Sequence, residues 1–211
     1  DVSHVFFAAY LEKPTPQEAV AANLGMLRNL VDAIEPAAAN LQHINLVEGS
    51  KWYGSHLGPY KTPAKESDPR VSQTIFYYDQ QDFLEQRQRG KRWTWSAIGP
   101  HTICGFAVGN PMNLTMVIAV YAAICKELGL PLSHPGKPGN YHTLYQATDS
   151  ALLSRAMVWM ATSAQCANQA VNVTNGDLFR WSSLWPKIAQ FFGMEVGPQR
   201  HINLEQFMAD K

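Results

Sequence analysis

The chain lacks an excess of charge of either sign, and it is poor in cysteine. Over its 211 residues, seventeen lysines and arginines balance seventeen aspartates and glutamates. This balance excludes the basic surface typical of a protein that binds nucleic acid or an anionic membrane. The three cysteines, Cys104, Cys125 and Cys166, are far apart and form no C-x-x-C pair. Their scatter argues against a disulfide framework and is typical of a reducing cytoplasm.

Long apolar runs, leader sequences and metal-binding motifs are also missing. The longest apolar stretch, 112–125, is interrupted by Asn113 and Thr115 and is shorter than the roughly 20 residues that span a bilayer. The first seven residues do not have the charged and then apolar pattern of a signal peptide. The seven histidines show neither H-x-x-x-H nor H-E-x-x-H spacing, which argues against a metal site. We therefore expect a cytoplasmic protein with no metal ion and no membrane or nucleic-acid partner.

The most informative absence is that of a glycine-rich phosphate loop. No G-x-x-G-x-x-G or G-x-G-x-x-G run occurs in the chain, although such a loop follows the first strand of a dinucleotide-binding fold. The sequence opens instead on 2–9, a run rich in Val and Phe that predicts a strand buried on both faces. A buried strand needs a neighbour on each side. We therefore expect this chain to be part of a longer polypeptide.

Strand and helix patterns alternate along the rest of the chain. This alternation predicts an α/β fold, with a doubly wound parallel sheet and helices on both of its faces. The expected strands are 2–9, 41–47, 93–98 and 169–174. The expected helices are 17–34 (ended by Pro36), 74–88, 113–128, 149–164 and a last helix that, because of Pro186, either starts near Leu184 or kinks there.

Three loops follow the best strand candidates, and in a parallel sheet such loops meet at one edge. They contain Ala8-Ala-Tyr10, Glu48-Gly-Ser-Lys51 and Gly99-Pro-His-Thr102. The second of them continues as a polar loop to about residue 72, and loops of that length in compact domains are usually functional. We expect the three loops to converge on one crevice.

Two adjacent tyrosines, Tyr77 and Tyr78, offer an acid for that crevice. A lysine beside a tyrosine stabilises the phenolate and lowers the phenol pKa from about 10. Short-chain dehydrogenases usually place that lysine four residues after the tyrosine, but here those positions hold Gln81 and Asp82. Lys51 is the candidate replacement, and we expect its side chain to meet that of Tyr77. Adjacent helical residues point about 100° apart, so Tyr78 is expected to be structural.

Several dispersed motifs together resemble a known family, the extended short-chain dehydrogenases of the progesterone 5β-reductase and iridoid synthase type with their bacterial relatives. The likeness covers nearly the whole chain and starts at what would be the fourth strand of that fold. The matching runs are Asp1-Val-Ser-His-Val-Phe, Gly49-Ser-Lys-Trp-Tyr, Gly58-Pro-Tyr60, Phe76-Tyr-Tyr-Asp79, Met112-Asn-Leu114, Val120-Tyr-Ala-Ala-Ile-Cys-Lys126 and Asn172-Val-Thr-Asn-Gly-Asp-Leu-Phe-Arg-Trp181.

The resemblance implies a division of labour along the chain. Residues 1–104 would be the C-terminal part of an NADP-binding Rossmann domain whose first strands are absent. Residues 105–211 would be mostly a substrate-binding lobe, with elements that return to the Rossmann core. The implied activity is NADPH-dependent reduction of activated C=C bonds in a small-molecule enone, and a homodimer is left open. The implied residues are Tyr77 and Lys51 for catalysis, Ala8, Ala9, Tyr10, Pro100, His101, Thr102 and Ile103 for the cofactor, and Tyr60 and Asn113 for the substrate.

The sequence departs from the plant members of that family at the pocket. They have Trp where this chain has Tyr10 and Phe where it has Tyr60, and their loop between Lys51 and Tyr60 is three residues shorter. Three other readings stay open. A nucleotide-sugar epimerase or dehydratase would need the missing Y-x-x-x-K pair, a non-catalytic NADP sensor would usually lack the tyrosine, and a truncated chain would be inactive. For His101 we favour a contact with the cofactor through its backbone over a role as general acid.

Overall fold

The computed structural model describes residues 2–107, 113–137 and 139–209. It divides into two compact units. The first comprises Asp1–His101 and Ala151–Val173, and the second comprises Thr102–Ser150 and Thr174–Lys211. The sequence-based division at residue 104 stays a prediction. No helix in the described ranges is both long and apolar enough to cross a membrane.

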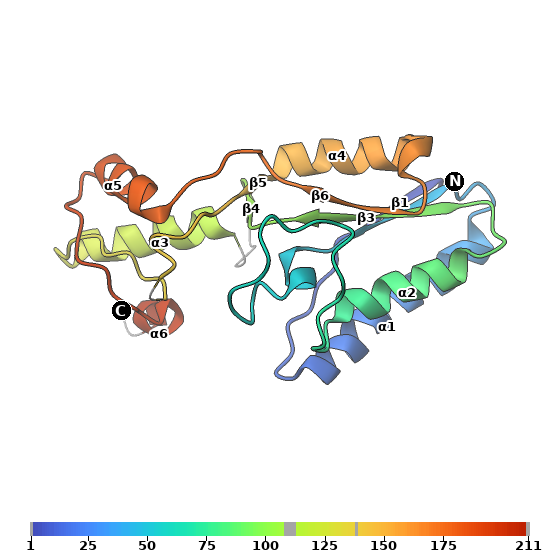
Figure 1. Cartoon of the computed structure of the whole chain (residues 1–211), viewed down its shortest axis with the longest axis horizontal. Coiled ribbons are helices and arrows are strands. Elements are labelled where there is room, and N and C mark those ends of the chain that lie inside the picture. Colours follow the sequence, from blue (N-terminus) through green and yellow to red (C-terminus); the bar gives the residue numbers. More distant parts are fainter. Residues whose placement is uncertain (1, 108–112, 138, 210–211) are drawn as a thin grey trace. The chain divides into compact units, whose positions relative to one another are not determined.

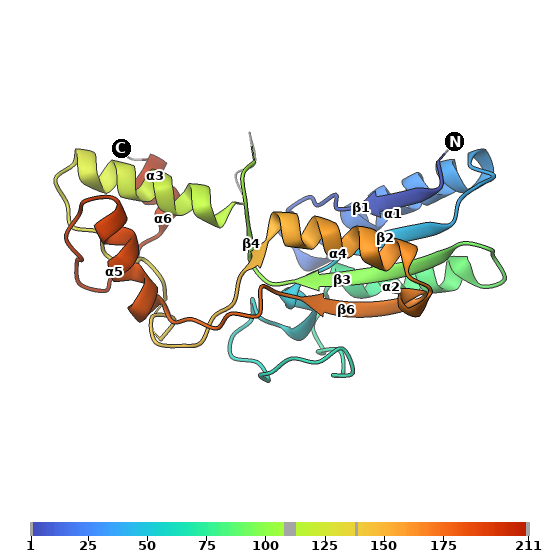
Figure 2. The same ribbon diagram turned by 90° about the horizontal axis from the view of Figure 1, so that it is seen from above.

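The first unit is built on a four-stranded parallel sheet. Its strands are β1 (His4–Phe7), β2 (His43–Val47), β3 (Thr94–Pro100) and β6 (Gln169–Val173), in the order β1-β2-β3-β6, and they lie side by side in Figure 2. The pairing puts the C-terminal residues Val47 and Ile98 next to each other. The carboxyl ends of the strands therefore share one edge, as the alternation of elements predicts for a doubly wound α/β fold.

Helices cover both faces of this sheet (Figure 1). Helices α1 (Pro16–Ala37) and α2 (Phe76–Gln88) lie on one face and α4 (Ser150–Thr162) on the other. The two central strands, β2 and β3, have buried side chains on both faces. In β1, by contrast, only Phe7 is buried and Phe6 is 43% exposed, so this strand does not show the burial on both faces that its sequence predicted. One core cluster joins Ile44, Leu46, Trp95 and Ala97 to Leu27, Val31 and Leu84 of the helices. The other joins Ile98 to Leu153, Met160 and Cys166.

Helix α1 begins with a capping box and runs further than expected. The Thr15 side chain accepts from the N–H of Glu18, and the Glu18 carboxylate accepts from the N–H of Thr15, which satisfies two of the free donors of the first turn. Pro36 does not end the helix as expected, because it lies in the last turn. There it removes only one backbone hydrogen bond, and the N–H of Ala38 still donates to the Ile34 carbonyl.

In its described residues, the second unit combines a two-stranded sheet with three helices. Its elements are β4 (Ile103–Cys104), α3 (Leu114–Glu127), β5 (Thr148–Asp149), α5 (Trp181–Phe191) and α6 (Leu204–Ala209). Of the two alternatives expected for the last long helix, the start near Leu184 is wrong, because α5 begins at Trp181 and contains Pro186. Trp181 and Trp185 are buried in the core of this unit with Tyr121 and Leu132. Burial of two large aromatic rings outweighs the one hydrogen bond that the proline removes.

Candidate active site

The site begins where β1, β2 and β3 end. A 3₁₀ helix, η1 (Ser50–Tyr53), follows β2. The Lys51 Nζ donates to the Tyr10 hydroxyl at 3.2 Å, and the Ser50 Oγ lies 2.9 Å from the His101 Nδ1. The structure thus links the loop after β2 to the loops after β1 and β3 at the carboxyl edge of the sheet.

The Lys51 ammonium sits on Tyr10 in this structure. Its Nζ is 5.1 Å from the centre of the Tyr10 ring and 4.0 Å from a carboxylate oxygen of Glu12. The Tyr10 hydroxyl donates to that same carboxylate, and its ring stacks on Phe76 at 5.6 Å. Tyr10 and Glu12 therefore hold the lysine beside the first turn of α2, the helix that carries Tyr77.

Tyr77 reaches the same edge from α2. A Cβ placed on Gly49 would lie 3.4 Å from the Tyr77 hydroxyl and 3.4 Å from the Pro100 carbonyl oxygen. The phenol oxygen thus lies against the backbone two residues before Lys51. It makes no hydrogen bond to any residue in the described ranges, so it remains available to a ligand. The direct pairing of Lys51 with Tyr77 stays a prediction.

The electrostatics of Tyr77 differ from the sequence-based expectation. Burial raises the pKa of the Tyr77 phenol, and the charges of Glu48 and Glu12 raise it further. We expected the lysine to lower this pKa, but the Lys51 ammonium lies over the Tyr10 ring and beside the Glu12 carboxylate, whose negative charge offsets it. Tyr77 is therefore a neutral phenol at physiological pH, able to donate a hydrogen bond to an oxygen that gains negative charge.

Tyr78 faces away from this hydroxyl and holds the long loop. Its side chain is buried, and its hydroxyl donates to the Trp52 carbonyl at 2.5 Å and accepts from the N–H of Val71 at 3.0 Å. The Trp52 ring packs edge-on against it at 4.6 Å. Both ends of the 52–71 segment are thus attached to one phenol, which is a structural role.

Further contacts tie this loop to α2 and to β6. The Arg70 guanidinium makes a bidentate ion pair with the Asp82 carboxylate of α2, with N–O distances of 2.8 and 2.6 Å. A Glu66 carboxylate oxygen accepts from the backbone N–H of Asn172 at 2.7 Å, and the Asn172 side chain bonds to the Tyr53 hydroxyl. The sequence did not reveal Arg70 or Glu66, because no spacing rule connects a loop residue to a partner on a distant element.

The loop also encloses a hollow of about 490 Å³. Tyr60 lines it together with Tyr53, Leu57 and Arg70, whereas Lys51 and Tyr77 are not among its lining residues. Partial burial raises the pKa of the Tyr60 phenol. The substrate role of Tyr60 stays a prediction, and this geometry places it in the hollow beneath the loop.

The remaining predicted residues fall in both units. Ala8 and Ala9 are exposed just after β1, and Pro100 ends β3. In the second unit, the Thr102 Oγ1 is 2.5 Å from the Tyr145 hydroxyl. Asn113 caps α3 there, accepting from the N–H of Thr115 and donating to the Gly105 carbonyl. Both ends of the Asn113 amide are therefore engaged in local structure. The predicted residue Ile103 lies in β4.

One residue of this edge was not singled out from the sequence. Glu48 directly follows β2 and is only 7% exposed. Its Oε1 has no hydrogen-bond partner among the residues that the structure describes. An acidic residue directly after a buried strand and directly before a glycine was the available indication.

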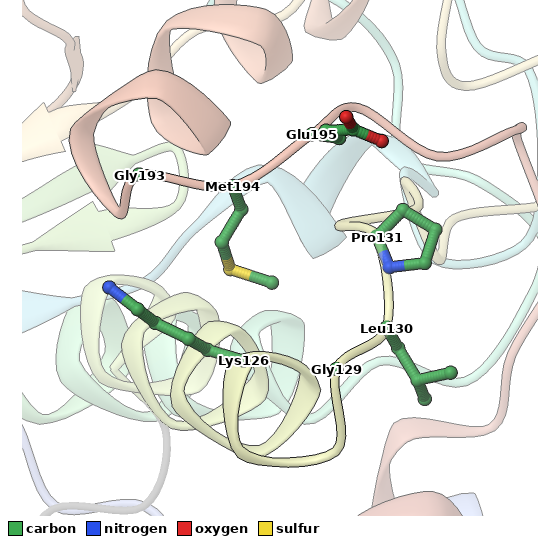
Figure 3. Close-up of a pocket in the computed structure, with 7 residues that line it drawn as sticks. All are labelled: Lys126, Gly129, Leu130, Pro131, Gly193, Met194 and Glu195. Atoms are coloured by element: carbon green, nitrogen blue, oxygen red, sulfur yellow. The ribbon is translucent and has the colours of Figure 1, made fainter.

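A second hollow, of about 250 Å³, lies in the second unit between the end of α3 and the segment after α5 (Figure 3). Its one basic group, the Lys126 ammonium, donates to the Phe192 carbonyl at 2.7 Å. Glycine, proline and apolar side chains form much of the rest of its lining. It offers no group of reactive side chains, and among the described residues no cluster of His, Cys, Asp and Glu is placed to hold a metal ion.

Comparisons with solved structures show which fold this is. RMD from Pseudomonas aeruginosa, complexed with NADPH, superposes with a TM-score of 0.76 over 98% of this chain and 79% of its own, at 13% identity. The UDP-glucose 4-epimerase of Thermus thermophilus, in complex with NAD, gives 0.68 over 99% of this chain and 71% of its own, at 17% identity. At these identities the likeness shows the Rossmann fold alone.

Sequence comparisons are more specific. The (S)-8-oxocitronellyl enol synthase ISY2 of Nepeta racemosa is 38% identical over 100% of this chain and 56% of its own length. The short chain dehydrogenase gsfE of Penicillium aethiopicum is 36% identical over 94% of this chain and 54% of its own. The chain thus spans about half the length of these curated relatives. The model of the PRISE-like Rossmann-fold domain matches residues 1–203, and the chain belongs to that family.

Proposed function

We propose that the complete protein is an NADPH-dependent reductase of activated C=C bonds in small α,β-unsaturated carbonyl compounds. The observation that carries this proposal is the neutral Tyr77 phenol. Its hydroxyl lies against Gly49 at the carboxyl edge of the sheet, with Lys51 two residues further along. Such edges are where open α/β sheets bind ligands.

The small residues of this edge fit a dinucleotide cofactor. Ala8 and Ala9 are exposed, and their small side chains leave the backbone after β1 accessible. Gly49 is buried, and a Cβ there would already lie at van der Waals distance, 3.4 Å, from both the Pro100 carbonyl oxygen and the Tyr77 hydroxyl. The two solved neighbours hold NADPH in one case and NAD in the other, which supports a nicotinamide cofactor. When bound, such a cofactor supplies the hydride that reduces the carbon β to a carbonyl. Ala8, Ala9, Tyr10, Pro100 and His101 of the first unit, with Thr102 and Ile103, are the residues we propose to contact it.

The role of the chain's own residues follows from the charge that develops on the substrate oxygen. Addition to the β-carbon turns the carbonyl into an enolate, so a donor aimed at that oxygen binds the transition state more tightly than the substrate. Tyr77, neutral and without another partner among the described residues, would be that donor. Lys51 would contribute positive charge from beside Tyr10. The word "enol" in the name of the Nepeta relative supports a chemistry in which such an oxygen must be stabilised.

The test is turnover by the complete protein with a panel of cyclic enones and enals. We expect NADPH to be consumed and the C=C bond, rather than the carbonyl, to be reduced in the isolated product. NADP binding without turnover of any panel member would instead favour a cofactor sensor. Retained C=C bonds with reduced carbonyls would contradict the proposed reaction while leaving the fold untouched.

We also propose that the protein is cytoplasmic. Cys104, Cys125 and Cys166 are all free thiols, and free thiols are typical of the reducing cytoplasm. A fluorescent fusion of the complete protein observed in its source cells would test this localisation.

A further inference from the structure

A buried carboxyl group belongs to the residue just before Gly49, against which the Tyr77 hydroxyl lies. Glu48 links the last residue of β2 to Gly49, and its backbone N–H donates to the Ile98 carbonyl of β3 at 2.9 Å. This bond continues the sheet ladder by one residue and fixes the backbone from which the side chain starts. Only 7% of the residue is exposed, so the carboxyl group is withdrawn from water.

One oxygen of the Glu48 carboxyl group, Oε1, has no hydrogen-bond partner within the described part of the chain. The charged and titratable groups that act on it or feel its charge are Arg70 of the loop, Glu85, Tyr77 and Tyr78 of α2, and Tyr53 of η1. The one cation among them, Arg70, is already paired with Asp82. Burial without a counter-ion favours the neutral acid.

The resulting protonation state differs from that of an ordinary glutamate. Burial raises the pKa of Glu48 to about 8, with Arg70 lowering it and Glu85 raising it by smaller amounts. At neutral pH the residue is therefore mostly a carboxylic acid. Glu48 is also the neighbouring group whose charge most strongly raises the pKa of Tyr77.

We propose that Glu48 is a positioning residue that must stay a neutral carboxylic acid for Tyr77 to hold the substrate oxygen, and that its ionisation switches the site off. The inference rests on the proposed function, because it concerns the charge that forms on that oxygen. A carboxylate behind Tyr77 would oppose negative charge on the phenol and on any oxygen bonded to it. The neutral acid exerts no such repulsion. No proton passes between Glu48 and Tyr77 in this scheme.

The test is the pH dependence of kcat and KM in the complete protein. We expect wild-type kcat to fall as Glu48 ionises, by up to about tenfold per pH unit if the ionised form is inactive. KM should change little, because the charge exists only in the transition state. Glu48→Gln cannot ionise at this position, so its kcat should not fall over the same pH range. An alkaline fall in Glu48→Gln identical to that of wild type would overturn the proposal.

Glu85→Gln is the matched control, since it removes a nearby carboxylate that is not next to Gly49. Because Glu85 raises the pKa of Glu48, its removal should shift the fall in kcat to lower pH, the opposite of the Glu48→Gln effect. If the role of Glu48 were purely structural, Glu48→Gln would have a lower kcat than wild type by the same factor at every pH. That result would overturn the proposal.

Stability measurements separate this inference from the proposed function. The folded protein keeps the Glu48 proton to higher pH than the unfolded chain does, so wild type should lose stability relative to Glu48→Gln between about pH 4.5 and 8. If the free energies of unfolding of wild type and Glu48→Gln changed with pH in parallel, Glu48 would not be a buried neutral acid. The proposal would then be overturned whatever the activity. A different outcome is that the protein reduces no enone while the stabilities of wild type and Glu48→Gln still diverge with pH. That outcome would overturn the proposed function and the control of activity by Glu48, but it would leave Glu48 as a buried neutral acid.

Discussion

At the scale of single residues, the two adjacent tyrosines have different tasks. The hydroxyl of Tyr77 is available at the carboxyl edge, whereas that of Tyr78 is bonded to Trp52 and Val71. The same Tyr→Phe change at neighbouring positions therefore separates the catalytic role proposed for Tyr77 from the structural role of Tyr78, with one oxygen atom removed in each case.

Tyr77→Phe should lower kcat of the complete protein by about 10²–10³, the usual loss for one oxyanion donor, with little effect on cofactor affinity. Tyr78→Phe should leave kcat nearly unchanged and lower the free energy of unfolding by about 1–3 kcal/mol, because it leaves the N–H of Val71 and the carbonyl of Trp52 without a partner. Steady-state kinetics and urea unfolding of both variants check this. Equal kcat in wild type and Tyr77→Phe would refute the mechanism.

Lys51→Ala should lower kcat comparably, since it removes the positive charge that Tyr10 and Glu12 hold at the carboxyl edge of the sheet. The matched control is Lys65→Ala, which removes an exposed lysine of the same long loop and should leave kcat within about twofold. Steady-state measurements of kcat for Lys51→Ala and Lys65→Ala test this prediction. A loss of equal size in both would point to a general effect of charge.

The residue types and spacing of the sequence predicted part of this site. The 100° step between helical neighbours separated Tyr77 from Tyr78, and the β–α alternation brought Lys51 to the same edge. The contact of Lys51 with Tyr10 and the burial of Glu48 were not predicted. Both depend on side-chain directions and on packing by distant segments, which no local pattern encodes.

At the scale of elements, β2 and β3 share a buried polar network. His43 is 2% exposed, and its two ring nitrogens lie 2.8 Å from the Thr94 Oγ1 and 2.7 Å from the Ser96 Oγ. Burial lowers the pKa of His43 to about 4, and the charge of His4 adds to this effect. The folded sheet thus holds a neutral imidazole.

This network predicts a loss of stability in acid. The unfolded chain takes up the His43 proton near pH 6.5, whereas the folded chain does so only near pH 4, so wild type should lose stability as the pH falls through that window. His43→Asn should be less stable at pH 7 but flatter between pH 6.5 and 4. Urea unfolding at several pH values measures this, with His142→Asn, an exposed position, as control. Parallel curves for wild type and His43→Asn would contradict it.

The attachment of the long loop to α2 is a second property at this scale. Arg70→Ala removes the ion pair with Asp82 and the stacking on Trp52 and Tyr78. It should cost about 1 kcal/mol of stability and speed limited proteolysis between residues 54 and 73. Arg70→Lys keeps the charge but not the two-pronged geometry, and we expect an intermediate rate. Unchanged cleavage in Arg70→Ala would show that the other contacts suffice.

At the scale of the whole molecule, the alternation of strands and helices predicted the fold. Boundaries were less predictable where tertiary packing competes with local preference, as at Trp181 and Pro186 of α5. The helix start there depends on two tryptophan rings entering the core of the second unit. The local sequence around Pro186 does not predict that such a core exists.

The described sheet leaves β1 with one neighbour, and Phe6 on that strand is 43% exposed. An open apolar edge strand pairs readily with other chains. The 211-residue chain expressed by itself should therefore self-associate, and Phe6→Lys should reduce the association because a charge on an edge strand opposes pairing. Light scattering measures this, with Phe191→Lys, an exposed change away from any strand, as control. Equal association in all three would exclude the β1 edge.

The anchoring of the long loop has a consequence for how this family can diversify. Glu66 and Arg70 fasten the later part of the loop to β6 and α2, and Tyr53 fastens its start. Gly58, in the stretch between these attachments, has a φ of +151° and open space around its Cα. Insertions and deletions there reshape the wall of the hollow without loosening the scaffold. Under the substrate role proposed for Tyr60, length changes in this short stretch would alter which substrates the hollow admits at little cost in stability.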